Sequence, residues 1–340
     1  MCSFNKNVKL IQESLHIKSP LVENLSCSEY SNGRPVYLKL DNNQPGGSFK
    51  IRGIGRSCQL AKEQGYDEIV CPSGGNAGVA SAYAARMLNL KAIIVIFKIT
   101  SEEIANKIEK EGAQVVRYGN RSDESIDHAK YLASDKTKRR KFIHPFDDPA
   151  VWEGNSSLID EIYRDLNGVQ PSLIVTCCGG GGLFCGIMKG LERYKWHSTG
   201  VLVMETTGSG SFKAMTENDY KPIKIVCDTL AKTLTSVIVC QEAANYASNP
   251  KFNVYSEVVT DLEAMEACLL IADHQRIMVE LSCGTVLSAL YKGIVSQILS
   301  SHPNLPDGPL VMIVCGGNDV KLKDMNEWKR LVDEAKGFNS

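Results

Sequence analysis

The segment GGSFKIRG, residues 46–53, is the part of the sequence on which the interpretation of the whole chain depends. It follows an apolar run at residues 36–40 that predicts a strand, and a turn signal, DNNQP, at residues 41–45. The paired glycines allow a tight turn, and the apolar pattern after Lys50 predicts a helix that begins there. A lysine at such a junction can lose solvation and neighbour other cations, and both effects lower the pKa of its ammonium group. Lys50 is therefore a candidate for Schiff-base chemistry, although an isolated lysine is more often a solvated surface charge.

Three glycine-dense segments follow: SGGNAG at residues 73–78, GGGG at 179–182 and CGGN at 315–318. Each comes after an apolar run that predicts a strand, where α/β enzymes place their ligand loops. The four glycines precede a predicted helix at residues 183–191, so backbone N–H groups and the positive helix end would face an anion. The pattern is neither a P-loop nor a dinucleotide fingerprint. A lysine, a phosphate cradle and amide-rich loops together fit pyridoxal 5′-phosphate (PLP).

On these motifs the chain resembles the L-serine/L-threonine dehydratases of the PLP fold-type II (tryptophan-synthase-β-like) family, from about residue 15 to about residue 317. The resemblance implies a β-elimination that converts L-serine or L-threonine into pyruvate or 2-oxobutyrate plus ammonia. It also implies an α/β protein with two open parallel-sheet domains and a PLP cleft between them. Predicted strands that alternate with helices agree with parallel sheets. We expect a small α/β domain over residues 44–148 and a large PLP-binding domain built from residues 1–43 and 149–340.

The resemblance also implies a role for each matching residue. Lys50 would hold PLP and move the Cα proton, and Phe49 would pack against the cofactor ring. Asn76 would bind the cofactor's 3′-oxygen, and Cys315 would face the pyridine nitrogen as a neutral thiol. The phosphate would be held by Gly179, Gly180, Gly181, Gly182 and Leu183. The substrate would be bound by Ser73, Gly74, Gly75 and Asn76. A monovalent cation, K⁺ or another, would be held by Glu205 and by carbonyls near Ser209, Leu234 and Ser236.

Other outcomes on the same fold stay open at this point. Serine racemases of this fold carry a serine where this chain has Gly74, which cannot transfer a proton, so racemisation is disfavoured. The sequence does not exclude β-replacement, and Lys50 argues against a non-catalytic relative that only binds PLP. Four residues depart from the dehydratase pattern, and we expect them to affect the preferred amino acid without touching the cofactor-anchoring residues: Phe97, Asn155, Leu281 and Asp319.

Composition narrows the function classes further. The net charge of −1 gives no basic field for nucleic acid or an anionic membrane, and no apolar run reaches the roughly 18 residues of a membrane span. The N-terminus lacks an apolar signal core, which predicts a cytoplasmic protein. The 12 cysteines are scattered without a C-x-x-C pair, so we expect reduced, mostly structural thiols. A helical lead-in is expected over residues 8–30, with an extended stretch at Pro20, and the resemblance favours a homodimer.

Overall fold

The larger of two sheets has six strands, in a computed structural model that describes residues 14–120 and 122–337. Its order is β1-β2-β10-β7-β8-β9, and every neighbouring pair is parallel except β1 and β2. The strands are β1 (Leu21–Glu23), β2 (Val36–Leu40), β7 (Leu173–Cys177), β8 (Gly200–Thr206), β9 (Asn253–Val259) and β10 (Leu310–Val314). Every residue of β7, β8 and β10 is buried, which explains their continuous apolar sequences in a sheet covered on both faces.

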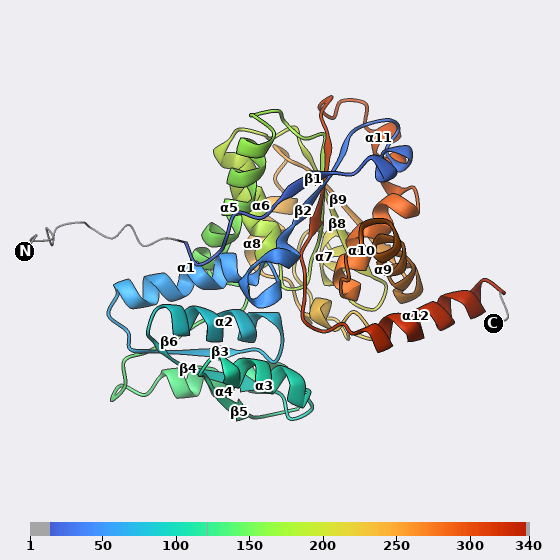
Figure 1. The fold of residues 1–340 in the computed structure, drawn as a ribbon. Helices are drawn as coiled ribbons and strands as arrows, with labels where there is room; N and C mark the ends of the chain where they lie inside the picture. Colours follow the sequence, from blue (N-terminus) through green and yellow to red (C-terminus); the bar gives the residue numbers. More distant parts are fainter. Residues whose placement is uncertain (1–13, 121, 338–340) are drawn as a thin grey trace, which may run out of the picture.

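Helices cover both faces of this sheet (Figure 1), with α5 and α6 on one side and α9 and α10 on the other. The helices associated with it are α5 (Pro149–Asp165), α6 (Gly182–Arg193), α7 (Ser211–Glu217), α8 (Gln241–Ala247), α9 (Asp261–Gln275), α10 (Leu281–Tyr291), α11 (Ile294–Ser301) and α12 (Leu322–Ala335). Helix α1 (Lys50–Glu63) packs against α5 but contributes its buried apolar residues to the core of the second, smaller sheet. The core between them includes Phe184 of α6, which packs edge-on against Phe212 of α7 with ring centroids 4.9 Å apart.

The smaller sheet has four parallel strands in the order β5-β4-β3-β6. They are β3 (Glu68–Pro72), β4 (Lys91–Ile96), β5 (Gln114–Arg117) and β6 (Arg140–Phe142). The connecting helices are α2 (Asn76–Met87), α3 (Glu102–Lys110) and α4 (Ser122–Ala133). The domain boundaries at residues 44 and 148 stay a prediction.

The expected helical lead-in is wrong over residues 14–24, although Leu25–Tyr30 do form a 3-10 helix, and residues 8–13 lie outside the described part. Residues 14–20 form no helix, and β1 then pairs antiparallel with β2. The reason is that buried partners fix Ser19 in an extended segment. Its N–H donates to Glu161 Oε2 at 3.1 Å, and its carbonyl accepts from Lys39 Nζ at 2.7 Å. A helix there would remove both contacts.

The parallel register brings three of the motif segments to one edge of the larger sheet. Leu310 of β10 pairs with Val36 of β2 on one side and with Leu173 of β7 on the other. The chain therefore leaves β2, β10 and β7 at the same edge, towards the Lys50 segment, Cys315 and the four glycines respectively. This is the edge where open α/β sheets bind ligands.

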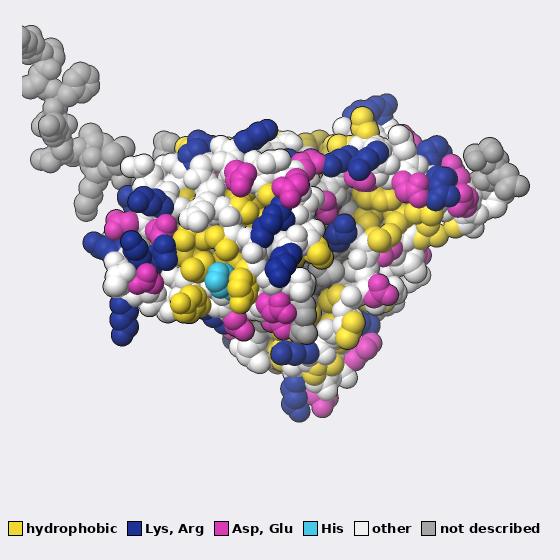
Figure 2. Space-filling model, turned by 90° about the horizontal axis from the view of Figure 1, so that it is seen from below, with side chains coloured by type: hydrophobic (Ala, Val, Ile, Leu, Met, Phe, Trp, Pro, Cys, Tyr) yellow, Lys and Arg dark blue, Asp and Glu magenta, His cyan; other side chains and the backbone are white. Residues whose placement is uncertain are grey.

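The surface adds two general findings. Figure 2 shows Lys and Arg side chains interspersed with Asp and Glu on the face viewed from below, so this face has no extended field of one sign. In the described residues, no helix is both long enough and apolar enough to cross a membrane.

Candidate active site

Backbone contacts fix the start of α1 against the end of β10. The N–H of Phe49 donates to the carbonyl of Cys315 at 3.0 Å, and the N–H of Gly317 donates to the carbonyl of Gly47 at 2.8 Å. Gly316, between them, has φ +83° and would place a Cβ 3.0 Å from the Cα of Ser48. Only glycine fits this crossing without strain. The structure therefore holds Lys50, the first residue of α1, beside Cys315.

The amine of Lys50 is half-buried. Its Nζ donates to the carbonyl of Pro145 at 2.9 Å and lies 5.2 Å from the ring centroid of Phe49. Burial lowers the pKa of the Lys50 ammonium, which favours the free amine. The expectation that nearby cations would help is wrong, because the side chains that act on this pKa most after burial are thiols and a carboxyl group, which raise it: Cys71, Cys177, Cys315 and Glu280.

Asn76 connects the two sheets through its side chain. It begins α2, and its Nδ2 donates to Glu280 Oε1 at 3.1 Å. Its Oδ1 accepts from the N–H and the Nδ2 of Asn318, at 3.0 and 2.9 Å. Asn318 Nδ2 also donates to the carbonyl of Gly46 at 2.7 Å. The amide of Asn76 is therefore oriented by contacts far away in sequence, and it does not form a local turn.

Glu280 is a site residue that the sequence analysis missed. Its buried carboxylate accepts from Thr233 Oγ1 and from Ser282 Oγ, both at 2.7 Å, in addition to Asn76. Burial raises the pKa of Glu280 to about 7, and these three donors only partly oppose the shift. A carboxylate directly before the apolar run at residues 281–290 was the signal in the sequence, because an acidic residue in such surroundings is rarely left unpaired.

The four glycines form a tight turn between β7 and α6. Gly181 precedes α6 with φ +98°, and a Cβ there would lie 2.8 Å from Cys240 Sγ. A Cβ at Gly180 would overlap the ring of Phe146, and one at Gly182 would lie 2.8 Å from the Phe146 carbonyl. Larger residues are therefore excluded from this loop. Since α6 begins here, the backbone N–H groups of its first turn have no partner within the helix and are free to bind an anion.

Asn155 corrects one expectation, because it does touch Gly182, a member of the predicted phosphate loop. It lies in α5, and its Nδ2 donates to the carbonyl of Gly182 at 2.9 Å. Its Oδ1 is buried without a hydrogen-bond partner. A second departing residue, Asp319, donates its N–H to Glu280 Oε2 at 3.4 Å. Both residues therefore contact groups of the candidate site. The effect of these two departures from the dehydratase pattern is not confined to the part of the site expected to bind the substrate.

Cys315 lies in a cluster of three thiols at the ends of β7, β10 and the start of α10. Its Sγ is 3.0 Å from Cys283 Sγ and 3.9 Å from Cys177 Sγ. Gly316 N–H donates to Cys283 Sγ at 3.1 Å, and the Cys283 thiol lies within reach of two acceptors, Cys315 Sγ and the Gly316 carbonyl at 3.4 Å. Hydrogen bonds from Cys177 and Cys283 lower the pKa of the Cys315 thiol. Burial of the thiol opposes this shift, and the expectation that Cys315 faces the pyridine nitrogen as a neutral thiol stays a prediction.

The predicted substrate loop lies between β3 and α2. Gly75 precedes α2, and its N–H donates to Ser73 Oγ at 3.3 Å. Gly74 is in close contact with Thr100, which follows β4. The first turn of α2 leaves N–H groups without intrahelical partners, as the first turn of α6 does. The loop can therefore offer backbone donors to a carboxylate.

The predicted cation residues are partly engaged with one another and with protein groups. Glu205 accepts from the N–H groups of Phe212 at 2.9 Å and Lys213 at 2.8 Å, and burial raises its pKa to about 7. Ser209 Oγ lies 2.9 Å from Thr206 Oγ1, and the carbonyl of Leu234 accepts from Ser236 N–H at 2.7 Å. Among the described residues, no group of three or more His, Cys, Asp or Glu side chains is arranged for a metal ion.

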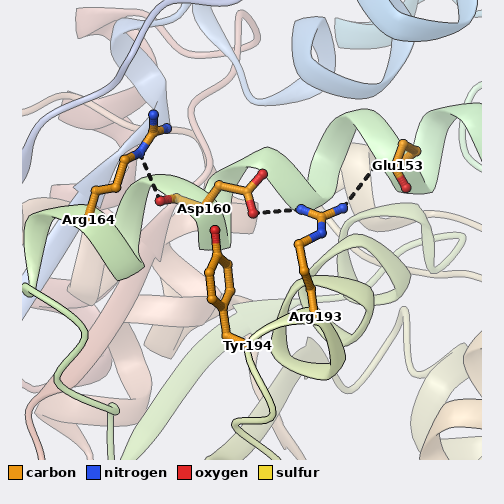
Figure 3. Close-up of a pocket in the computed structure, with 5 residues that line it drawn as sticks. All are labelled: Glu153, Asp160, Arg164, Arg193 and Tyr194. Carbon is orange, nitrogen blue, oxygen red and sulfur yellow. Dashed lines mark hydrogen bonds and ion pairs between the residues drawn. The ribbon is translucent and has the colours of Figure 1, made fainter.

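Figure 3 shows a pocket elsewhere, between α5 and the end of α6. Arg193 donates to Asp160 at 2.6 Å and to Glu153 at 2.9 Å, and Arg164 donates to the carbonyl of Asp160 at 3.1 Å. These charges already neutralise one another at a half-exposed surface. The pocket is lined by these surface ion pairs, and it contributes no residue to the candidate site.

Fold and site together define a PLP enzyme of fold type II, and comparisons with known proteins agree. Residues 13–316 match the family described as "Pyridoxal-phosphate dependent enzyme". The chain is 41% identical over 329 residues to an L-serine dehydratase of Dictyostelium discoideum, covering 92% of this chain and 91% of the relative. It is 38% identical over 319 residues to a human L-serine dehydratase/L-threonine deaminase, covering 93% and 95%.

A solved structure is similarly close. The fungal L-serine ammonia-lyase from Rhizomucor miehei superposes with a TM-score of 0.84 at 32% sequence identity, covering 94% of this chain and 99% of the fungal one. The chain belongs to the family of pyridoxal-phosphate dependent enzymes.

Proposed function

We propose that this protein catalyses the PLP-dependent β-elimination of L-serine, L-threonine or both, releasing pyruvate or 2-oxobutyrate and ammonia. The observation that carries the proposal is the convergence of a desolvated lysine, Lys50, with Cys315 and the Asn76–Glu280 pair at one sheet edge. The relatives named L-serine dehydratase and L-threonine deaminase, which match this chain along almost their whole length, support the same reaction.

The residues present fit PLP. The turn must be glycine because a Cβ at Gly180 or Gly181 would collide with Phe146 or Cys240, and the N–H groups at the start of α6, which lack partners within the helix, are the groups that would hold a phosphate. Ser48 Oγ, two residues before Lys50, is buried without a hydrogen-bond partner and is a further polar atom available to the cofactor. Cys315, polarised by two neighbouring thiols, suits a neutral pyridine nitrogen.

Each residue then has a defined task. When bound, PLP supplies an electron sink that stabilises negative charge at the substrate Cα. Lys50 holds the cofactor and takes the Cα proton, for which its lowered pKa prepares it. Asn76 orients the 3′-oxygen, while Gly179, Gly180, Gly181, Gly182 and Leu183 hold the phosphate. The backbone of Ser73, Gly74 and Gly75 binds the substrate carboxylate. Phe49 packs against the ring.

The decisive experiment identifies the products of the reaction and the lysine to which the cofactor is attached. Purified protein incubated with L-serine or L-threonine is expected to give pyruvate or 2-oxobutyrate plus ammonia, measured by mass spectrometry. Borohydride reduction followed by peptide mapping is expected to place the cofactor on Lys50. Recovery of the adduct on another lysine, or formation of neither oxo acid, would contradict the proposal. D-serine is expected to be negligible, because Gly74 itself has no side chain to return a proton to the opposite face; substantial D-serine would mean that another residue, such as the neighbouring Thr100, supplies that proton.

The phosphate loop has its own test. Gly180→Asp is expected to weaken PLP binding at least about 100-fold, because its side chain overlaps Phe146 and its charge opposes the phosphate. Gly180→Ala separates the two effects, since it adds the overlap without the charge. Unchanged cofactor affinity in titrations of both variants would mean that the four glycines form only a turn.

Three finer assignments belong to the same proposal. A monovalent cation is proposed at Glu205 and the carbonyls of Ser209, Leu234 and Ser236, supported by the all-oxygen character of this set. Activity compared in K⁺, Na⁺ and a bulky organic cation tests it. A homodimer is proposed from the resemblance to the dehydratases, and light scattering tests it. A cytoplasmic location is proposed as well, and cell fractionation tests it.

A further inference from the structure

Thr100 occupies the space that a side chain at position 74 would fill. Gly74 follows β3 in the substrate loop, and Thr100 follows β4, the neighbouring strand. A Cβ built on Gly74 would overlap Thr100 Oγ1, and would lie 3.1 Å from its Cγ2 and 3.3 Å from its Cβ. The hydroxyl and the methyl group of Thr100 therefore both face the loop at Gly74. The two positions share one volume.

The backbone of Thr100 is held in place, while its hydroxyl is left available. The N–H of Thr100 donates to the carbonyl of Phe97 at 3.1 Å, and its carbonyl accepts from Arg117 Nη1 at 2.8 Å. Arg117 is itself paired with Glu102, at the start of α3, at 2.7 Å. The half-buried hydroxyl of Thr100 has no hydrogen-bond partner within residues 14–120 and 122–337. Its position is thus fixed by contacts that do not use the hydroxyl.

We propose that Thr100 is a substrate-contacting residue, whose hydroxyl donates to the carboxylate of the amino acid bound on the Ser73–Asn76 loop and whose methyl group borders the substrate at Gly74. This inference rests on the function proposed above. Gly74 alone would leave an open space beside the substrate. Thr100 closes that space from the neighbouring strand and adds a side-chain donor to the backbone N–H groups at the start of α2.

The first test removes the hydroxyl and keeps the shape. In the PLP-loaded protein, Thr100→Val is expected to raise the KM for L-serine about 10-fold or more, because a hydrogen bond to a charged group is lost. The kcat should stay within about threefold, and Thr100→Ser should restore the KM. Thr137→Val, in an exposed loop, is the matched control and should change neither constant. An unchanged KM in Thr100→Val would overturn the proposal.

The second test uses the volume that a side chain at position 74 would share with the side chain of Thr100. Gly74→Ala should lower kcat/KM for L-serine at least about 10-fold in the natural background, because its Cβ collides with Thr100. In a Thr100→Ala background, where Oγ1 and Cγ2 are absent, the same change should cost less than about twofold. Additive effects of the two substitutions would mean that the positions are independent, which would overturn the shared pocket.

A binding measurement separates this inference from the proposed reaction. Amino-acid binding changes the absorbance of enzyme-bound PLP, so affinity can be read without turnover. If L-serine binds but is not converted, the proposed elimination fails while a weaker affinity in Thr100→Val still supports Thr100 as a contact. If L-serine is converted normally by Thr100→Val with unaltered affinity, the elimination stands and the role of Thr100 fails.

Discussion

Two polar clusters, each built around a buried carboxylate, lie near the beginning of α1, and they shift the pKa of that carboxylate in opposite directions. The ion-paired cluster contains Arg52, Lys39, Asp41 and Glu161. Arg52 pairs with Asp41 and with Glu161 at 2.7 Å each, and Lys39 pairs with Glu161 at 2.7 Å. The neutral-donor cluster surrounds Glu280 and contains Asn76, Thr233 and Ser282.

The difference is the charge of the partners. Burial alone would raise the pKa of Glu161, but the hydrogen bonds and charges of Arg52 and Lys39 outweigh it and lower this pKa to about 2. Glu280 is also buried, yet its hydrogen-bond donors are neutral, so its pKa rises to about 7. Two positive and two negative groups make the first cluster a fixed scaffold at neutral pH. The second holds a carboxylate that can gain or lose a proton near neutrality.

The largest expected effect lies at Lys50, which stands between the clusters. Lys50→Ala should lower kcat by about 10³-fold or more, because proton transfer by a positioned group is lost. The free energy of unfolding should change by less than about 1 kcal/mol, since neither cluster loses a member. Denaturant titration and steady-state kinetics measure the two quantities. Lys62→Ala, exposed in the same helix, is the control. Normal turnover in Lys50→Ala would contradict the assignment of catalysis to Lys50 and of stability to the ion-paired cluster.

Breaking the ion-paired cluster should affect stability most. Arg52→Met is expected to lower the free energy of unfolding by about 3–5 kcal/mol, because Asp41 would remain buried without a paired cation and Glu161 would keep only Lys39. Arg330→Met, at the surface of α12, should lower the free energy of unfolding far less, because its ion pairs are exposed to solvent. Equal effects of the two substitutions in denaturant titrations would show that the buried network is no scaffold.

Glu280→Gln should have an effect that depends on pH. The folded pKa of Glu280, about 7, is above its usual value of 4.5, so its contribution to stability is full below about pH 4.5 and is lost as pH rises through 7. In cofactor-free protein, the natural chain should therefore lose stability relative to Glu280→Gln as the pH is raised from about 4.5 to 8. The difference between their free energies of unfolding should change by on the order of 3 kcal/mol in favour of the variant.

Glu161→Gln is the matched comparison, because its effect on the free energy of unfolding should change with pH in the opposite direction. The folded pKa of Glu161 is depressed to about 2, so its contribution is present above about pH 4.5 and is lost as pH falls through 2. Glu161→Gln should be the less stable protein at pH 7, and its deficit should shrink below about pH 4.5. If unfolding measured across pH gave parallel curves for the two Gln variants, the contrast between the clusters would not hold.

The smallest expected effect comes from one neutral donor. Thr233→Val removes a hydrogen bond to Glu280 and should cost about 1–1.5 kcal/mol of stability at pH 8. It should also move the pKa of Glu280 further above 7, seen as a higher midpoint in the pH dependence of unfolding. Thr235→Val, two residues on and exposed, should leave that midpoint in place. A midpoint that moves equally in both variants would mean that the Thr233 contact is unimportant.

Much of the site was predictable from short sequence patterns, because those patterns are local. The helix that begins at Lys50, the strands at residues 173–178 and 310–315 and the helix after the four glycines follow from turn residues and apolar spacing. A glycine run after a buried strand predicts an anion-binding turn whatever the rest of the chain does. The family resemblance, and with it the fold, could be identified from these motifs.

Tertiary structure decided which distant side chains meet. Glu280 touches Asn76 across 204 positions in the sequence, and Asn155 reaches the phosphate loop from α5, so no local pattern could predict either contact. The expected helix before Pro20 failed because Ser19 is bound by Glu161 and Lys39, partners that only folding brings to it. Likewise, the missing side chain at Gly74 was visible in the sequence, but the neighbouring strand determined that Thr100 fills its place. Burial and the charge of such partners set the pKa values, and both depend on the folded chain.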